Sequence, residues 1–367
     1  MVKLLKWLVG LGVVAILAII ISVTGLILIS GQNPAEYARA VLARISLNGR
    51  EADLAPLNPS DSAPIRFEVT MGSSPAGIGQ NLAGAGLVRD ADLFVNYVRA
   101  EGIDGQLEAG TYFLNRAQSL PQIALALTDS AAAYIPFRLL EGWRLEQIAD
   151  IIDQNPLFGF SGQEFLIAAG TGQGVSQTFL VTVGLTAGDS LEGFLFPNTY
   201  QLPPDITALG LIETLTDEFL NQVGGQVITD AVAQGFTLRQ AVTLASIVQR
   251  EAVRTDEMPK IASAYRNRLD IGIKLDADPT VQYALGAIRG TWWPQITRAD
   301  YTDVISPYNT YLNIGLPPSP IASPGLNAIL AAVYPATTPY LYFRADCRDD
   351  GYHDFALTYE EHLANGC

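Results

Sequence analysis

The segment TLRQAVTLASIVQREAVRTDEM, residues 237–258, has the pattern of an amphipathic α-helix. At about 100° per residue its apolar side chains gather into one arc, which is typical of a helix that packs on a core. Thr237, with Gln240 three residues later, forms a capping-box pattern and predicts where the helix begins. The opposite side is predicted to face solvent and to carry Arg239, Thr243, Ser246, Gln249, Arg250 and Arg254.

One carboxylate in this segment departs from the pattern. Glu251 comes four residues after Ile247 and three after Val248, so it lies inside or at the edge of the apolar arc. Burial disfavours the charged form of a carboxyl group and raises its pKa towards the range of a general acid. A buried ion pair, with Arg254 or a more distant arginine, is the alternative interpretation of Glu251.

The composition excludes several classes of function. The chain has 367 residues, a formal net charge of −15 and a pI near 4.5. It contains no basic stripe with interleaved aromatic residues, so we expect no nucleic-acid partner. The only histidines are His353 and His362, and neither a metal-binding spacing nor a phosphate-binding loop is present. We therefore expect no metal and no other cofactor.

The N-terminal region predicts a membrane anchor. Residues 7–29, WLVGLGVVAILAIIISVTGLILI, are almost wholly apolar and long enough to cross about 30 Å of hydrocarbon as a helix. A signal peptide is the alternative, but its apolar region spans only about 7–15 residues. Lys3 and Lys6 precede the span and favour a cytoplasmic location for residues 1–6. We expect a single-pass protein of the cell membrane with an extracytoplasmic body.

The remaining sequence predicts an α+β fold in two parts. Residues 30–64 are expected to form a juxtamembrane linker, because their second half is rich in Pro, Asn, Asp and Ser. The strand-like FEVTMG and the helix-like SSPAGIGQNLAGAGL then open a small α+β module over residues 65–133. Residues 134–367 predict a larger mixed α+β domain, which opens on a similar strand, turn and helix in YIPFRLLEGWRLEQIADII.

Two cysteines, Cys347 and Cys367, lie near the C-terminal end of the chain. In an exported domain they could form a disulfide. Spacing alone does not establish that their Cα atoms come within reach, so a free Cys367 is the alternative.

Two other carboxylates occur in unusual settings. Glu192 lies in the apolar and aromatic stretch DSLEGFLFPNTYQLPPD, and Asp278 lies in KLDADPTV. Each has an alternative structural interpretation: Glu192 as a cap or a partner of an arginine, and Asp278 as the N-cap of a helix whose first residue is Pro279. Because no Gly-x-Ser-x-Gly elbow is present, carboxylates are the candidate catalytic groups.

Five motifs together carry a resemblance to a known family. They are, in chain order, LEGFLFPNTY, ASIVQREA, DPTVQYALG, SPYNTYLNIGLPPSPIASPG and TPYLYFRAD followed by GYHDFALTYEEH. In this combination the chain resembles the YceG-like (MltG-type) endolytic murein transglycosylases from about residue 65 to its end. The resemblance implies a LysM-like module at residues 65–133 and a catalytic transglycosylase domain at residues 134–367.

The resemblance also implies a reaction. The family motif carries two glutamates, of which the second is the catalytic acid, and here Gln249 replaces the first while Glu251 retains the second. Glu251 would protonate the oxygen between N-acetylmuramic acid and N-acetylglucosamine, then accept the proton of the muramoyl 6-hydroxyl as a 1,6-anhydro ring closes. Such a lyase would cut nascent peptidoglycan strands beside the membrane and end their elongation, with peptidoglycan synthases as expected partners.

Five further residues match family motif positions and are candidates for binding substrate or for holding Glu251 in place: Glu192, Asp278, Tyr308, Asn309 and His353. A hydrolase that uses water, with Glu192 or Asp278 as its second carboxylate, is one alternative function. An inactive, anchored scaffold that binds peptidoglycan through its LysM-like module is the other.

Overall fold

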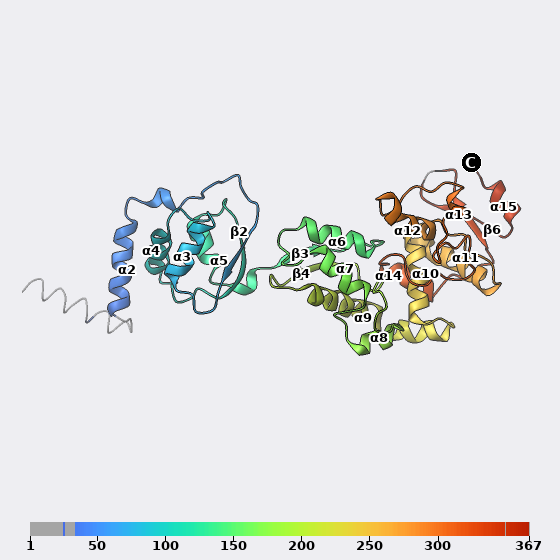
Figure 1. The fold of residues 1–367 in the computed structure, drawn as a ribbon, viewed down its shortest axis with the longest axis horizontal. Helices are drawn as coiled ribbons and strands as arrows, with labels where there is room; N and C mark the ends of the chain where they lie inside the picture. The colour runs from blue at the N-terminus through green and yellow to red at the C-terminus, as the bar shows by residue number, and fades with distance from the viewer. Residues whose placement is uncertain (1–24, 26–33, 349, 367) are drawn as a thin grey trace, which may run out of the picture. The chain divides into compact units, whose positions relative to one another are not determined.

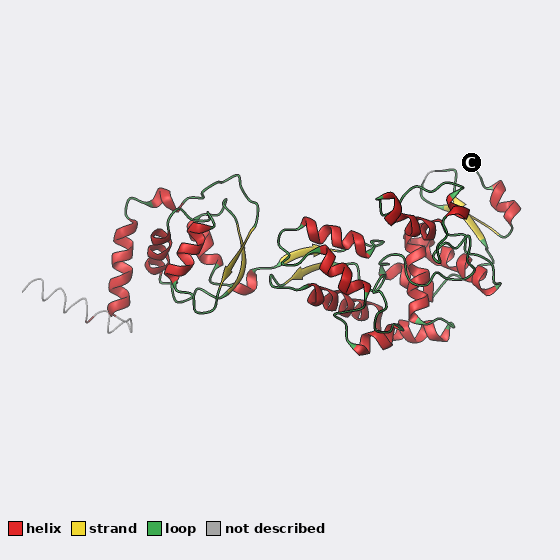
Figure 2. Cartoon of the chain, in the orientation of Figure 1, coloured by secondary structure: helices red, strands yellow, loops and turns green. Residues whose placement is uncertain are grey.

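The computed structural model describes Gly25 and residues 34–348 and 350–366. Its contacts divide the chain into two compact units, Met1–Tyr134 and Ile135–Cys367. Helices dominate both units, and the described strands form three separate two-stranded sheets (Figure 2). The mixed α+β class predicted from the sequence is therefore confirmed.

The predicted membrane span, residues 7–29, lies outside the described residues apart from Gly25. Among the helices that the structure does describe, none combines the length and the apolar character needed to cross a membrane.

The first unit surrounds one antiparallel strand pair with helices. Strand β1 (Ile65–Val69) pairs with β2 (Gly110–Leu114), and Phe67 stands opposite Tyr112. The helices of this unit are α2 (Pro34–Leu47), η1 (Glu51–Leu54), α3 (Pro75–Gly84), α4 (Ala91–Glu101), α5 (Leu120–Ala126) and η2 (Ser130–Ala132). Helix α2 packs on α4 (Figure 1). A continuous apolar core, which includes the fully buried Leu82 and Phe94, fills the space between the helices and the sheet.

Local sequence explains where these helices begin. Ser74 and Ser119 each accept a hydrogen bond from a backbone N–H of the first turn and are followed by a proline near the helix start. Asp90 caps α4 in the same manner. Residues 55–64 run along the unit rather than away from it, since Asp61 forms a salt bridge with Arg116 at 3.0 Å.

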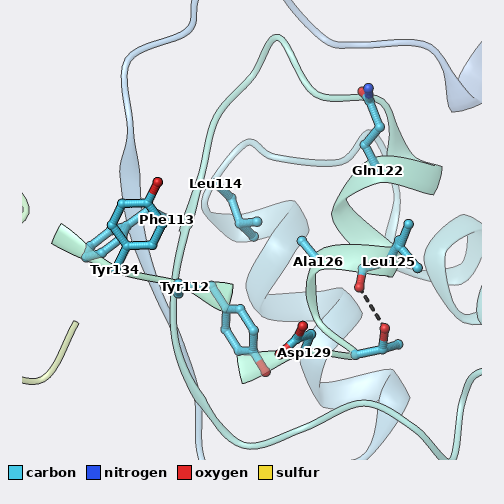
Figure 3. Close-up of a pocket in the computed structure, with 10 residues that line it drawn as sticks. Tyr112, Phe113, Leu114, Gln122, Leu125, Ala126, Asp129 and Tyr134 are labelled. Carbon is cyan, nitrogen blue, oxygen red and sulfur yellow. Dashed lines mark hydrogen bonds between the residues drawn. The ribbon is translucent and has the colours of Figure 1, made fainter. Parts of the chain in front are cut away.

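The first unit contains a hollow of about 650 Å³. Figure 3 shows Gln122, Leu125 and Ala126 of α5 on one side and Phe113 and Tyr134 on the other. None of the candidate catalytic or substrate-binding residues predicted from the sequence lines this hollow.

The second unit opens with a second strand pair and its covering helices. Strand β3 (Ile135–Arg138) pairs with β4 (Thr199–Leu202) in antiparallel register. The helices here are α6 (Leu145–Gln154), α7 (Gly162–Gly170), α8 (Gln177–Val183) and α9 (Ala208–Ala233). Helix α9 is broken at Gly224, where φ is 72°.

Helix α10 (Leu238–Glu251) is the central element of the rest of this unit (Figure 1). It packs on α9, α11 (Met258–Asp270), α12 (Asp278–Arg289) and α14 (Leu326–Val333). The remaining elements are η3 (Thr255–Glu257), α13 (Asp300–Asp303), the hairpin β5 (Tyr342–Ala345) with β6 (His353–Ala356), and α15 (Tyr359–Ala364). Cys347 is disulfide-bonded, and Cys367 lies outside the described residues.

The predicted start of α10 is confirmed, but its predicted solvent face is wrong for Thr243 and Ser246. Thr237 and Gln240 form the capping box in both directions. Thr243 and Ser246, expected on the exposed side, are 2% and 0% exposed. The reason is that a loop covers this side of the helix as well, and Ser246 Oγ accepts a hydrogen bond from the N–H of Ile321 in that loop at 3.0 Å.

The loop that covers this side of α10 is anchored along its length. The N–H of Ser323 donates to the carbonyl of Trp143 at 2.7 Å, and the N–H of Gly325 donates to Gln249 Oε1 at 2.9 Å. Gln249 is therefore half-buried and anchors the loop, whereas the helical periodicity predicted that it faces solvent. Gly193, with φ of 84°, lies so close to Pro320 that an added Cβ would stand 2.3 Å from the proline Cβ.

This close approach predicts a difference in stability between two glycines of one loop. Gly193→Ala would combine left-handed strain with overpacking, so we expect it to lower the free energy of unfolding of the second unit by about 2–4 kcal/mol. Gly188 also has a positive φ of 97° but nothing within 4 Å of an added Cβ, so Gly188→Ala is expected to cost only about 1 kcal/mol. Denaturant unfolding of the two variants measures the difference, and equal losses would contradict this account.

Candidate active site

Glu251 is the last residue of α10 and the only carboxylate of that helix. Its Oε1 accepts a hydrogen bond from the hydroxyl of Tyr265, on α11, at 2.7 Å. The residue keeps partial exposure to solvent, whereas Leu244, Ile247 and Val248 before it are fully buried. The carboxyl group thus lies at the point where the buried helix reaches the surface.

The surroundings of Glu251 favour its uncharged form. Desolvation by burial is the main cause that raises the pKa of this carboxyl to about 7, and the neighbouring charge of Asp278 adds to it. The hydroxyl of Tyr265 and the guanidinium of Arg250 act in the opposite direction. The C-terminal end of a helix carries partial negative charge, which also disfavours a carboxylate there. At neutral pH Glu251 can therefore both donate and accept a proton.

No salt bridge engages Glu251 in the described part of the chain. Arg254, one predicted partner, instead donates from Nε to the carbonyl of Asp350 at 2.9 Å and lies over the ring of Tyr352. Arg250 stacks on Trp293, with its guanidinium carbon 4.0 Å from the ring centroid.

Asp278 lies close enough to Glu251 for their charges to interact. Its predicted role as an N-cap is wrong, because the cap of α12 is Ala277 and Asp278 is already the first helical residue. The carboxylate of Asp278 instead binds a residue outside the helix: its Oδ1 accepts a hydrogen bond from the hydroxyl of Tyr311 at 2.6 Å. The ring of Tyr311 stacks on that of Tyr301 with centroids 4.1 Å apart.

Glu192 forms a second buried carboxyl site. It is 2% exposed, and its Oε2 accepts from the N–H of Leu145 at 3.3 Å and from the hydroxyl of Tyr283 at 3.4 Å. The first bond makes it a cap for the start of α6, as one interpretation of the sequence expected. Burial is the main cause that raises its pKa to about 8, and Oε1 has no hydrogen-bond partner among the described residues.

Arg144 stands beside Glu192 but is already engaged. Its guanidinium binds Glu146 at 3.0 Å, donates to the carbonyl of Tyr283 at 3.0 Å and lies 4.1 Å from the centroid of the Tyr283 ring. Because Arg144 forms its salt bridge with Glu146, its positive charge stabilises the carboxylate of Glu192 only in part. The Glu192 carboxyl therefore remains mainly protonated at neutral pH.

The other three candidates hold loops and strands. Tyr308 exchanges a hydrogen bond of 2.6 Å with Ser319. Asn309 is 0% exposed and donates to the carbonyls of Tyr301 and Val304 at 3.1 and 2.9 Å. Neither side chain is therefore free for a ligand in this conformation.

His353 belongs to a chain of contacts that ends at the site. Its Nδ1 lies 2.9 Å from Glu257 Oε2, and its ring meets the edge of Phe343, which in turn packs on Tyr265. It supports the tyrosine that binds Glu251 and does not itself contact the carboxyl among the contacts described.

Sequence reasoning missed two tyrosines of the site. Tyr265 and Tyr301 lie in ordinary helical segments, and nothing in their spacing signals a contact with Glu251 or Asp278. The sequence offered one indication for Tyr265, which is its position on the apolar face of α11. A buried tyrosine hydroxyl usually finds a hydrogen-bond partner, so such a position suggests a polar contact.

Comparisons with known proteins agree with this arrangement of motifs. The sequence profile of the YceG-like family matches residues 67–366. The endolytic murein transglycosylase of Bacillus subtilis (strain 168) is 30% identical over 323 residues, which cover 84% of this chain and 86% of that protein. The protein of the same name from Streptococcus pneumoniae serotype 2 (strain D39 / NCTC 7466) is 28% identical over 335 residues, which cover 85% of this chain and 59% of that protein.

A solved structure is also similar. The crystal structure of a YceG-like protein from Listeria monocytogenes shares 30% sequence identity with this chain and aligns with a TM-score of 0.57, covering 82% of this chain and 98% of that one. The family resemblance drawn from the motifs is thereby confirmed. With most of its length matched by the family profile and by a relative at 30% identity, the chain belongs to the YceG-like family.

Proposed function

We propose that this protein is an endolytic lytic transglycosylase of peptidoglycan in which Glu251 is both acid and base. The observation that carries the proposal is the setting of Glu251: a partly exposed carboxyl at the end of a buried helix, bonded to Tyr265 and with a pKa raised to about 7. The names of the relatives from Bacillus subtilis and Streptococcus pneumoniae support the same reaction class.

The proposed reaction needs one carboxyl in two protonation states. In the first step, Glu251 gives its proton to the oxygen that links C1 of N-acetylmuramic acid to N-acetylglucosamine, and the C1–O bond breaks. In the second, the Glu251 carboxylate takes the proton of the muramoyl 6-hydroxyl, and the O6–C1 bond forms a 1,6-anhydro ring. No water is consumed, so a second carboxylate is not required to activate one.

The remaining assignments follow from the sequence and the family. We assign residues 65–133 to a LysM-like module and residues 134–367 to the catalytic domain. Residues 7–29 would anchor the protein in the cell membrane, with residues 1–6 cytoplasmic and residues 30–64 keeping the catalytic domain near nascent strands. Cleavage there would terminate glycan elongation, beside the peptidoglycan synthases.

We assign supporting roles to four of the candidate residues: Glu192, Tyr308, Asn309 and His353. Each makes a side-chain hydrogen bond to the protein itself, and Glu192 and Asn309 are almost inaccessible to solvent. Internal bonds of this kind suit residues that shape a site more than residues that bind a sugar.

Replacing the acid is the first test. Glu251→Gln keeps the size of the side chain but cannot donate the proton, so we expect strand cleavage to fall by about 10²–10⁴-fold. Glu192→Gln is the matched control: because Glu192 is protonated at neutral pH, its amide should lose less than about tenfold. Digestion of purified peptidoglycan, followed by mass spectrometry of the products, measures both.

The products separate the alternatives. Muramoyl 1,6-anhydro ends from the wild type support the transglycosylase, whereas reducing ends would indicate a hydrolase, and a loss in Glu192→Gln as large as in Glu251→Gln would make Glu192 its second carboxylate. Binding to sacculi without any cleavage would indicate a scaffold protein.

The hydrogen bond from Tyr265 predicts a shift of the pH profile. This bond favours the charged form of Glu251, so Tyr265→Phe raises the pKa of the carboxyl. The acid form then persists to higher pH, and the alkaline limb of the kcat profile should move upward by about half a unit to one unit. A limb that stays in place or moves to lower pH would show that Tyr265 does not act on the acid.

A further inference from the structure

The backbone just before Asp278 is held in an unusual conformation. Asp276 has φ of 51°, and it is the only non-glycine residue with a positive φ in the part of the chain that the structure describes. Such a conformation persists only where surrounding contacts impose it, and it is concentrated at functional sites.

Arg268 supplies those contacts. Its buried guanidinium donates to the carbonyls of Lys274 and Leu275 at 2.9 and 2.8 Å and forms a 3.0 Å salt bridge with Asp276. A further bond to the carbonyl of Leu341, at 2.6 Å, ties the turn to the strand region that follows α14. One arginine therefore fixes the turn that leads into Asp278.

A second set of contacts fixes the carboxylate itself. The hydroxyl of Tyr311 donates to Asp278 Oδ1 at 2.6 Å, and the ring of Tyr301 packs against that of Tyr311. The two rings are stacked with an interplanar angle of 16°. On the other side of the turn, the N–H of Ala277 donates to Thr310 Oγ1 at 3.0 Å.

This much support is not needed to begin a helix. Asp278 caps nothing, and no salt bridge neutralises it among the described residues. What the support achieves is to hold a negative charge at the start of α12, which packs on α10, near enough for that charge to act on Glu251.

We propose that Asp278 is a positioning residue for Glu251: the Arg268 turn and the Tyr301–Tyr311 stack fix its carboxylate at the start of α12, the helix that packs on α10, which ends at Glu251. Its negative charge opposes the ionisation of Glu251 until the leaving oxygen takes the proton. The inference deepens the proposed function and rests on the role of Glu251 in it. Asp278 acts here through Glu251 and needs no contact with the substrate.

The charged and titratable groups around Glu251 come from three helices. Arg250 lies on α10 itself, Tyr265 on α11 and Asp278 on α12. Two further groups influence the pKa of Tyr265: the charge of Arg268 lowers it and Tyr311 raises it. Among these three groups, Asp278 is the one whose negative charge disfavours the ionised form of Glu251.

The test is Asp278→Asn in the full chain. Loss of the negative charge lowers the pKa of Glu251, so the alkaline limb of the kcat profile should move to lower pH by about one unit, opposite to the shift in Tyr265→Phe. The pH dependence of carbodiimide labelling of Glu251, read by mass spectrometry, should shift by the same amount and requires no activity. Asp270→Asn, an exposed residue at the end of α11, is the control for the same change in net charge and should shift neither curve.

Unshifted curves in a folded Asp278→Asn would overturn the inference. If that variant does not fold, Tyr311→Phe replaces it: Asp278 then loses the hydrogen bond that holds its carboxylate and favours its charge, both curves should move to lower pH, and unmoved curves would again overturn the inference. A shift in labelling together with a wild type that cleaves no glycan would uphold the inference for Glu251 and reject the proposed function.

Discussion

The burial of helix α10 is the constraint on which the rest of the second unit depends. From Leu238 to Val248 all but two of its residues are buried, polar ones included, so every neighbouring element must either pack against it or hydrogen-bond to it. Glu251 stands where this enclosure ends. Desolvation and the negative end of the helix both act against its charge, and the site chemistry follows from that position.

The role that we propose for Glu251 depends on more than burial, as a comparison with Glu192 illustrates. Glu192 is buried more completely than Glu251 and its pKa is raised further. It nevertheless lies at an enclosed junction between the start of α6 and Tyr283, where it is only 2% exposed. Both carboxyls accept a hydrogen bond from a tyrosine hydroxyl, Glu251 from Tyr265 and Glu192 from Tyr283, so access to solvent is what sets Glu251 apart. A group proposed to give up and regain a proton needs that access as well as a raised pKa.

The site is held together mainly by side chains that bind backbone groups. Arg268 satisfies carbonyls of the turn after α11 and that of Leu341. Asn309 does so within its own loop, and Ser246 and Gln249 accept hydrogen bonds from N–H groups of the loop that covers α10. Loops rich in proline and glycine lack the regular ladders of strands and helices. Buried side chains therefore supply the missing hydrogen-bond partners, and this keeps the loops in one shape.

Much of this could be predicted from the sequence, since some signals are local. The mixed α+β class, the capping box of α10, the family and the unusual setting of Glu251 all follow from periodicity, capping residues and motifs. The solvent face of α10 was wrongly predicted, because a helical wheel describes two sides of a helix and cannot reveal that neighbours cover both. The role of Asp278 was mistaken for a cap for a similar reason: its partner Tyr311 lies 33 positions away.

The sequence by itself determined which carboxyl interrupts the apolar face of its helix, because the spacing of Glu251 from Ile247 and Val248 is a property of the chain. Only the tertiary structure decided what surrounds it. Tyr265, Asp278 and the Arg268 turn come from separate segments, and electrostatic effects on a pKa depend on distances in space and on the exclusion of water. Those quantities exist only once the helices have packed.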